Sequence, residues 1–248
     1  RYPLVTGVQT CALPISDAYG RVKRIPGVAL ATSGPGATNL ITGIASCYFD
    51  SSPAIFITGQ VNISELKGDR SIRQLGFQET DIVTMANVIT KKSYAVKNAS
   101  DIPNIMEEAF TLATSGRPGP VLIDIPMNIQ REWINVNSTK KQLKHKPAKI
   151  QVSQIAQVYQ SIIHSKKPLL LFGRGIKTEA VSTELAMFLK TTQLPVVTSL
   201  LGYDAIEFQS KQRVGFIGSY GNRWANIALG NCDLLIVMGS RLDIRQTG

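Results

Sequence analysis

Ala31-Thr32-Ser33-Gly34-Pro35-Gly36-Ala37-Thr38-Asn39 is the stretch of this sequence that decides the fold. It follows the apolar run at residues 27–30 and precedes a helical apolar pattern at residues 40–47. This order predicts a strand, a tight turn of small residues and then a helix. Glycines in such a turn let a ligand approach the backbone closely, and the helix would point its first N–H groups at that ligand. The glycine spacing matches neither a Walker A loop nor a GxGxxG fingerprint. Taken alone, the stretch fits an ordinary strand-to-helix turn without a ligand.

The composition is that of a globular protein with one or two domains. The chain has 248 residues, of which 44% are hydrophobic and 18% are charged, and both fractions are ordinary. No apolar stretch is long enough to span a bilayer and no signal peptide opens the chain, so we expect no membrane partner. Cys11, Cys47 and Cys232 lie far apart without metal-ligand spacing. They predict free thiols in a reducing, cytoplasmic compartment.

The formal charge of +10 raises the question of nucleic acid as a partner. Much of this charge lies in one lysine-rich run at residues 140–149, which has no interleaved aromatic residues. The run stands between two patterned segments. We therefore predict a solvated basic linker over residues 136–152 and no nucleic-acid binding.

Short apolar runs alternate with helical patterns along the rest of the chain. Strands are expected at residues 28–31, 54–59, 121–125, 168–172, 195–199 and 233–238. Helices are expected from the central turn to about Tyr48 and at residues 101–115, 153–165, 179–191 and 222–229. Ser100 or Asp101 would cap the second of these and Ser153 the third. Alternating strands and helices with near-continuous apolar strands predict an α/β fold of two doubly wound parallel-sheet domains, the second Rossmann-like.

The two ends of the chain differ from its middle. Residues 1–16 contain two prolines and no sustained period, and residues 5–15 resemble translated sequencing-adapter sequence. We therefore predict a non-native leader over residues 1–16, with a real but irregular N-terminal arm as the alternative. A helix is expected to end at residues 17–22. The chain stops at Gly248 after a strand, with no closing helix expected, so the second domain is predicted to be truncated.

Five motifs stand in the order found in acetolactate synthase large subunits. They lie at residues 32–39, 58–61, 77–80, 116–121 and 239–248. The resemblance covers roughly residues 17–248. It implies a thiamine-diphosphate-dependent, FAD-containing enzyme, with a pyrimidine-binding domain at 17–135 and part of a central FAD-binding-type domain at 153–248. The Mg²⁺ ligands of such enzymes would lie in a third domain that this sequence does not contain.

The resemblance also implies roles for residues near the first motif. Those expected at thiamine diphosphate are Ser33, Gly34, Pro35, Gly36 and Asn39. Pro35 and Asn39 would line the aminopyrimidine pocket. Gln78 would reach the cofactor and Phe77 would wall the substrate cavity, with ordinary core packing as the alternative for Phe77. The family's catalytic glutamate should fall where Gln9 stands. A glutamine there can hydrogen-bond but cannot exchange the proton that the cofactor chemistry needs, so a poor catalyst is expected.

For FAD the resemblance implies residues from both domains. They are Arg117, Gly173, Arg174, Gly175, Thr198, Gly218, Tyr220, Gly239, Ser240, Arg241 and Asp243. The planar guanidinium of Arg117 suits pyrophosphate oxygens, and a surface arginine at a helix end is the alternative. The glycine pair at 173 and 175 is a weak signal by itself because many strand-to-helix turns contain one. Arg245 would face the carboxylate of an acceptor ketoacid.

Three departures from the family pattern concern the acceptor substrate. The segment at residues 62–76 is several residues longer, Ser219 stands where Met is usual, and Ile244 stands where Asp is usual. The last two flank the implied acceptor site. A keto sugar, as in related enzymes of surface-polysaccharide pathways, therefore fits as an acceptor at least as well as a ketoacid.

The leading prediction is a thiamine-diphosphate-dependent 2-ketoacid decarboxylase or carboligase with pyruvate as the donor. The resemblance implies branched-chain amino acid biosynthesis, a structural flavin, a homodimer or homotetramer with the active site between two subunits, and room for a regulatory subunit. One alternative is a glyoxylate carboligase-like enzyme, in which the pyrimidine-facing glutamate is naturally missing. Another is a non-catalytic flavin- or nucleotide-binding module. The chain alone is expected to be inactive and to bind thiamine diphosphate weakly or not at all.

Overall fold

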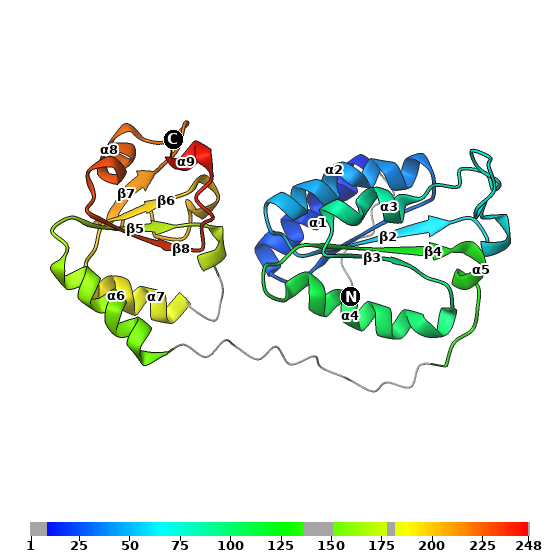
Figure 1. Cartoon of the computed structure of the whole chain (residues 1–248), viewed down its shortest axis with the longest axis horizontal. Coiled ribbons are helices and arrows are strands. Elements are labelled where there is room, and N and C mark those ends of the chain that lie inside the picture. Colours follow the sequence, from blue (N-terminus) through cyan, green and yellow to red (C-terminus); the bar gives the residue numbers. More distant parts are fainter. Residues whose placement is uncertain (1–8, 136–150, 178–181, 248) are drawn as a thin grey trace. The chain divides into compact units, whose positions relative to one another are not determined.

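The computed structural model describes residues 9–135, 151–177 and 182–247 (Figure 1). The chain divides into two compact units, Arg1–Lys146 and Pro147–Gly248. Each unit is built on its own parallel sheet, which confirms the predicted α/β class with two parallel-sheet domains.

The first unit contains a four-stranded parallel sheet of order β1-β2-β4-β3. Its strands are β1 (Gly27–Ala31), β2 (Ala54–Gln60), β3 (Lys92–Ala95) and β4 (Pro120–Pro126). Its helices are α1 (Gln9–Lys23), α2 (Pro35–Phe49), α3 (Ile82–Ala86), α4 (Ile102–Thr114) and α5 (Met127–Gln130), with 3₁₀ turns at Ile63–Glu65, Asn87–Ile89 and Ala99–Asp101. The carboxyl ends of β1, β2 and β4 therefore lie along one edge of the sheet.

Successive residues of β2 point to opposite faces of this sheet, and each face carries its own core. Phe56 packs with Leu40 and Ile44 of α2 on one face, whereas Ile55 packs with Ala109 of α4 on the other. Figure 1 shows α2 and α3 on one side and α4 on the opposite side. One apolar stripe of α4 packs into the second core: Ile102, Ile105, Met106, Ala109 and Leu112.

The second unit repeats this plan with a parallel sheet of order β7-β6-β5-β8. Its elements are α6 (Val152–His164), β5 (Pro168–Phe172), α7 (Ser182–Thr192), β6 (Val196–Thr198), β7 (Arg213–Phe216), α8 (Arg223–Asn231), β8 (Leu234–Met238) and α9 (Ile244–Thr247), with 3₁₀ turns at Arg174–Ile176 and Leu200–Gly202. Leu171 of β5 packs with Ala225 of α8, and Phe172 packs with Phe188 of α7. Helices cover both faces, as a doubly wound fold requires.

The sequence patterns did not predict β3, β7 or the short helices α3, α5 and α9. Both strands are edge strands with half-buried residues, such as Tyr94 in β3 and Val214 in β7, so they lack the continuous apolar run of a central strand. The expectation that no helix follows the last strand is wrong, because Ile244–Thr247 forms one turn of helix.

Two helix starts also differ from expectation. Asp101 takes the N-cap position of α4, but its side chain makes no capping bond and instead accepts from Asn98 Nδ2 at 3.1 Å. At α6 the cap is Gln151 rather than Ser153, and Gln154 closes a capping box with it.

The first helix begins earlier than its pattern indicated. α1 starts at Gln9, so the alternative of an irregular N-terminal arm is wrong for residues 9–16, whereas the non-native leader stays a prediction. Ser16 is buried, and its carbonyl oxygen lies so close to Gly27 that a Cβ on this glycine would collide with it. The second half of α1 is held to α2 by Arg21, which bonds both Asp17 and Asp50.

Candidate functional site

Two predicted site segments of the first unit meet at Gly34 and Gln78. Gly34 has a φ of 63° and Gln78 a φ of 60°, so both hold the left-handed backbone conformation. A Cβ built on Gly34 would lie 2.7 Å from the Cβ of Gln78, closer than real Cβ atoms approach. The turn after β1 and the turn at residues 76–80 therefore meet at the carboxyl edge of the first sheet, where ligands of open α/β sheets bind.

The predicted motif forms the start of α2 in the way its residues require. Gly34 is the N-cap, and Pro35 occupies the first turn, where a missing N–H costs nothing. Thr38 N donates to Gly34 O at 3.0 Å and closes the turn. Ser33 is half-buried, whereas Pro35 and Asn39 are exposed on the outer side of this helix start. The first turn of α2 thus presents N–H groups and a positive dipole end at this edge.

Phe77 and Gln78 differ in exposure. The Phe77 side chain is 81% exposed, which excludes the alternative of ordinary core packing. Gln78 is half-buried against Gly34. The turn that carries both residues is closed by Glu79 N, which donates to Gly76 O at 3.2 Å. An exposed aromatic ring next to Gln78 leaves the predicted role of Phe77 as the wall of a substrate cavity open to test.

Glu79 holds the long segment at residues 62–76, a role that the sequence did not predict. One carboxylate oxygen accepts from Lys67 N and the other from Leu75 N, both at 2.8 Å. Partial burial opposes ionisation, but the N–H groups of Leu75 and Lys67 outweigh it and hold the pKa of Glu79 below its usual range. Both bonds go to backbone N–H groups, and that of Lys67 lies twelve residues away, so no spacing of residue types predicted them.

A buried carboxyl group, Asp124, connects the strand ends behind Gln78. Its two oxygens accept from Thr58 Oγ1 at 2.6 Å and from Gln60 Nε2 at 3.1 Å. The same Gln60 nitrogen donates to Thr80 O at 2.7 Å, and Gln60 Oε1 accepts from Val61 N at 3.0 Å. Burial raises the pKa of Asp124 to about 6. The sequence held a signal for this group, since an acid inside a buried apolar strand needs partners.

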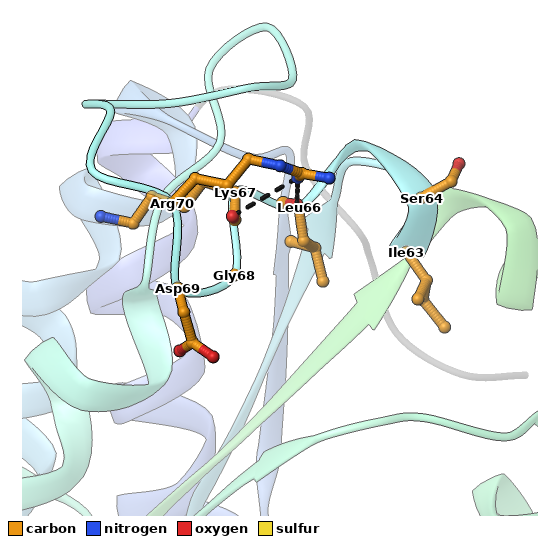
Figure 2. Close-up of a pocket in the computed structure, with 7 residues that line it drawn as sticks. All are labelled: Ile63, Ser64, Leu66, Lys67, Gly68, Asp69 and Arg70. Atoms are coloured by element: carbon orange, nitrogen blue, oxygen red, sulfur yellow. Dashed lines mark hydrogen bonds between the residues drawn. The ribbon is translucent and has the colours of Figure 1, made fainter.

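The long segment at residues 62–76 forms a hollow of about 640 Å³ on the surface of the first unit (Figure 2). Its lining residues are Ile63, Ser64, Leu66, Lys67, Gly68, Asp69 and Arg70. Arg70 Nη1 donates to the carbonyl oxygens of Leu66 at 3.1 Å and Lys67 at 3.4 Å, as Figure 2 shows. None of the predicted cofactor residues lines this hollow.

Arg117 is a predicted site residue that does not lie at the Gly34–Gln78 contact. Arg117 lies just before β4, at the opposite, amino edge of the sheet, where its Nε donates to Ser51 Oγ at 2.6 Å. Its Nη2 donates to Phe49 O at 3.3 Å, which suits the alternative of a surface arginine at a helix end. Gln9 is the first residue of α1, and its side chain lies outside the described part of the structure.

In the second unit, the residues predicted for FAD gather at the carboxyl edge of the sheet. They occur in the segments after or at the ends of four strands: Gly173, Arg174 and Gly175 after β5, Thr198 in β6, Gly218 and Tyr220 after β7, and Gly239, Ser240, Arg241 and Asp243 after β8. This edge is where a parallel α/β sheet presents its ligand-binding loops.

The glycines at this edge are explained by their packing against one another. Gly175 N donates to Gly239 O at 2.9 Å, and Gly173 N donates to Met238 O at 2.8 Å. A Cβ on Gly175 would lie 2.9 Å from the Cα of Gly239, which itself has a φ of 68°. The two loops interlock backbone to backbone, so these glycines are needed whether or not a phosphate approaches them.

The remaining polar groups at this edge differ in their surroundings. Thr198 is buried, and among the described residues its Oγ1 has no hydrogen-bond partner. Tyr220 is 83% exposed, and Arg241 is exposed 3.7 Å from the carboxylate of Asp243. The Asp243 carboxylate also accepts from Arg245 N at 3.1 Å.

The segment after β7 is tied to the last helix through its backbone. Ser219 N donates to Arg245 O at 3.0 Å, and Gly218 exchanges hydrogen bonds with the side chain of Asn226. Arg245 itself is exposed, with its side chain at the surface of the second unit. The carboxyl edge therefore carries exposed cations on a backbone that is held in place.

In residues 9–135, 151–177 and 182–247, no group of three or more His, Cys, Asp or Glu side chains could hold a metal ion. Cys47 and Cys232, the cysteines with described side chains, are not in disulfides. In the same part of the chain, no helix combines the length and the apolar character that crossing a membrane requires.

Comparison with protein families matches both units. Residues 8–85 match the thiamine pyrophosphate enzyme, N-terminal TPP binding domain, and residues 155–248 match the thiamine pyrophosphate enzyme, central domain. The first range contains the Gly34–Gln78 contact, and the second begins within α6 and covers the whole second sheet. The two units thus match the N-terminal and central domain models of the thiamine pyrophosphate enzyme family.

The chain is similar to acetolactate synthases. It is 40% identical over 238 residues to acetolactate synthase 3, chloroplastic, of Brassica napus, covering 94% of this chain and 35% of that protein. It is 38% identical over 236 residues to the acetolactate synthase isozyme 2 large subunit of Escherichia coli K12, covering 93% and 41%. The mitochondrial acetolactate synthase of Schizosaccharomyces pombe is 36% identical over 245 residues, with 94% and 36% covered. The chain therefore spans well under half the length of these curated relatives.

Proposed function

We propose that the protein containing this chain is a thiamine-diphosphate-dependent carboligase of the acetolactate synthase type, with a 2-ketoacid such as pyruvate as the donor. The observation that carries the proposal is the contact between Gly34 and Gln78 at the carboxyl edge of the first sheet. It joins two motifs that the family resemblance assigns to one cofactor. The similarity to acetolactate synthases supports the same reading.

The residues present fit the aminopyrimidine end of thiamine diphosphate. The absent Cβ of Gly34 leaves room for Gln78 over the start of α2, and Pro35 and Asn39 are exposed beside it. When bound, thiamine diphosphate supplies a carbanion equivalent and an electron sink for decarboxylation. Gln78 would donate to or accept from the cofactor's polar atoms, while exposed Phe77 would exclude water from the substrate side. Ser33 and Gly36 would shape the backbone that supports them.

FAD is proposed for the second unit and Mg²⁺ for a part of the protein beyond this chain. The buried, unpaired Thr198 Oγ1 and the exposed Arg241 and Tyr220 at the carboxyl edge support a ligand with phosphate and ring groups. Arg174 would meet the phosphates, and Arg245 would face the carboxylate of the acceptor. Arg117 is proposed for FAD on the resemblance alone.

The acceptor substrate, the oligomeric state, the pathway and the cellular location are likewise proposals. A second ketoacid would suit branched-chain amino acid biosynthesis, whereas a keto sugar would suit the long segment at residues 62–76. A homodimer or homotetramer and a regulatory partner are proposed because a relative is named a large subunit. A cytoplasmic location is proposed from the cysteines, although two of the relatives named above are chloroplastic or mitochondrial.

Titration of the complete protein with thiamine diphosphate and Mg²⁺, followed by assay of pyruvate consumption, tests this function. Cofactor-dependent release of CO₂ and formation of a carboligation product are expected. Binding of FAD with no response to thiamine diphosphate would instead favour a non-catalytic flavin-binding module. Glyoxylate consumption in preference to pyruvate would favour the glyoxylate carboligase-like alternative.

The chain by itself is proposed to be inactive. Gln9 at the start of α1 cannot take the proton-exchanging role of a glutamate, and no metal-binding cluster occurs in the described residues. Calorimetry of the 248-residue chain with thiamine diphosphate and Mg²⁺ is expected to give weak or no heat of binding. A tight, Mg²⁺-dependent complex would contradict this proposal.

A further inference from the structure

We infer that Asp124 is a positioning residue for Gln78, which it holds against Gly34 through the side chain of Gln60 and the backbone carbonyl of Thr80. This inference deepens the proposed function and rests on it for the role of Gln78. Its structural part, the control of the turn at residues 76–80 by a buried carboxyl group, can be measured without any cofactor.

The connection runs through hydrogen bonds that share one nitrogen. Gln60 Nε2 donates to Asp124 Oδ2 at 3.1 Å and to Thr80 O at 2.7 Å. Thr80 O also accepts from Ile82 N at 2.9 Å, so this carbonyl fixes both the turn and the start of α3. Asp124 therefore aligns the amide that anchors the turn two residues after Gln78.

The hydrogen bond from the Gln60 side-chain amide to Asp124 cannot easily be replaced by a bond to another group. Gln60 Oε1 is already used by Val61 N at 3.0 Å, so rotating the amide to present oxygen to Asp124 would break that bond and the bond to Thr80. Gln60 and Asp124 are both at least nine-tenths buried, so water cannot easily replace a lost partner. The orientation of Gln60 thus depends on Asp124 accepting a hydrogen bond.

The strength of this acceptor depends on the charge of Asp124. As a carboxylate it forms charge-assisted bonds, which are about twice as strong as neutral ones. When protonated, it can donate to Thr58 Oγ1, which can accept as well as donate, and Gln60 then keeps only a neutral acceptor. The turn is consequently held more firmly with Asp124 ionised.

The groups around Asp124 set the pH at which its carboxyl group ionises. Its strand neighbours are uncharged: Thr58 of β2 and Ala95 of β3. Asp81, the N-cap of α3, faces it with a like charge that opposes ionisation, while Glu79 directs its carboxylate to Lys67 N and Leu75 N. With burial added, the pKa of Asp124 lies at about 6. The anchor therefore weakens within the range that a cell can reach.

Hydrogen exchange of the backbone amides, read by NMR between pH 5 and 8, tests the inference on the 248-residue chain. Protection of the Val61, Glu79 and Ile82 amides, corrected for intrinsic exchange, is expected to fall several-fold on going from pH 7.5 to pH 5. The midpoint should match the titration of the Asp124 carboxyl carbon. Protection that stays constant while Asp124 titrates would overturn the inference.

Two variants separate positioning from general stability. Asp124→Asn keeps the shape, because its amide can donate to Thr58 while its oxygen accepts from Gln60; protection should stay at the low-pH value at every pH. Asp81→Asn keeps an N-cap on α3 but removes the like charge, so the midpoint should move to lower pH with the turn intact. Wild-type protection and pH dependence in Asp124→Asn would contradict the inference.

A cofactor measurement on the complete protein then separates this inference from the proposed function. Asp124→Asn should weaken the binding of thiamine diphosphate by the same factor by which it lowers amide protection in the turn at residues 76–80. The turnover of the enzyme saturated with cofactor should change little. If the complete protein binds no thiamine diphosphate at any pH, the proposed function fails, while the exchange data still decide whether Asp124 controls the turn.

Discussion

Gly34 and Gln78 meet with left-handed backbone on both sides, and a side chain on Gly34 would collide with the Cβ and Cγ of Gln78, at 2.7 and 3.2 Å. Gln78 can hold this position because Gly34 has no Cβ. The glycine is required here for close approach of a neighbouring turn, in addition to its positive φ.

Replacing Gly34 by alanine should therefore displace Gln78 and weaken thiamine diphosphate binding by the complete protein at least tenfold. The variant should also lose about 2–4 kcal/mol of unfolding free energy, about 1–2 from the left-handed backbone and the rest from overpacking. Gly68→Ala is the matched control, because Gly68 has a φ of 54° with nothing within 4 Å of an added Cβ. Equal losses of stability in the two variants would refute the collision with Gln78.

The sequence predicted three of the four strands of each sheet and missed one edge strand in each, β3 and β7. β2 and β5 are buried runs whose apolar residues pack on both faces of their sheets. Their composition alone therefore predicts a strand. β3 and β7 pair on one side only and carry Lys92 and Arg213, so their pattern resembles that of a loop. Edge strands are set by the neighbours they pair with, and a single sequence does not display those neighbours.

The candidate site shows the same division. The turn at Gly34 could be predicted because its glycine and the following helix are local features. Glu79 and Asp124 could not be assigned partners, since they bond to groups that only the folded chain brings near: Lys67 N, Leu75 N and Gln60 Nε2. Whether Gln9 stands where the family has glutamate stays a prediction.

The raised pKa of Asp124 predicts how stability changes with pH. A folded-state pKa of about 6 against 3.8 means that the folded state keeps a proton which the unfolded state releases between these values. The free energy of unfolding should therefore fall by about 2 kcal/mol as the pH rises from 4 to 6, and then level off above about pH 7. Urea unfolding of the wild type against Asp124→Asn isolates this group, because other carboxyl groups titrate equally in both. A difference between the two that does not change from pH 4 to 6 would exclude the predicted shift.

The hydrogen bonds of Glu79 predict that its carboxylate holds the segment at residues 62–76 in its folded conformation. In Glu79→Gln one oxygen is replaced by a donor, which must oppose either Lys67 N or Leu75 N. Loss of one charge-assisted bond should cost about 1–3 kcal/mol and speed tryptic cleavage at Lys67, Arg70 or Arg73 several-fold. Glu65→Gln serves as the control, since both donors of Asn62 use a single oxygen of Glu65, which glutamine retains. Unchanged cleavage in Glu79→Gln would show that the segment is held by other contacts.

The interlocked loops of the second unit predict that Gly175 matters for folding even without FAD. A Cβ at this position would lie 2.9 Å from the Cα of Gly239. The atoms of Gly239 that it would meet are backbone atoms, which cannot move aside as a flexible side chain can. Gly175→Ala should lower the free energy of unfolding by about 1–3 kcal/mol in the absence of flavin. Gly230→Ala in α8 is the opposite case, because nothing lies within 4 Å of its added Cβ and alanine favours a helix by about 0.5–1 kcal/mol. Thermal unfolding of both variants without FAD should move the midpoint down for Gly175→Ala and up for Gly230→Ala. If Gly175→Ala were neutral without FAD and harmful only with it, the glycine would serve the flavin rather than the fold.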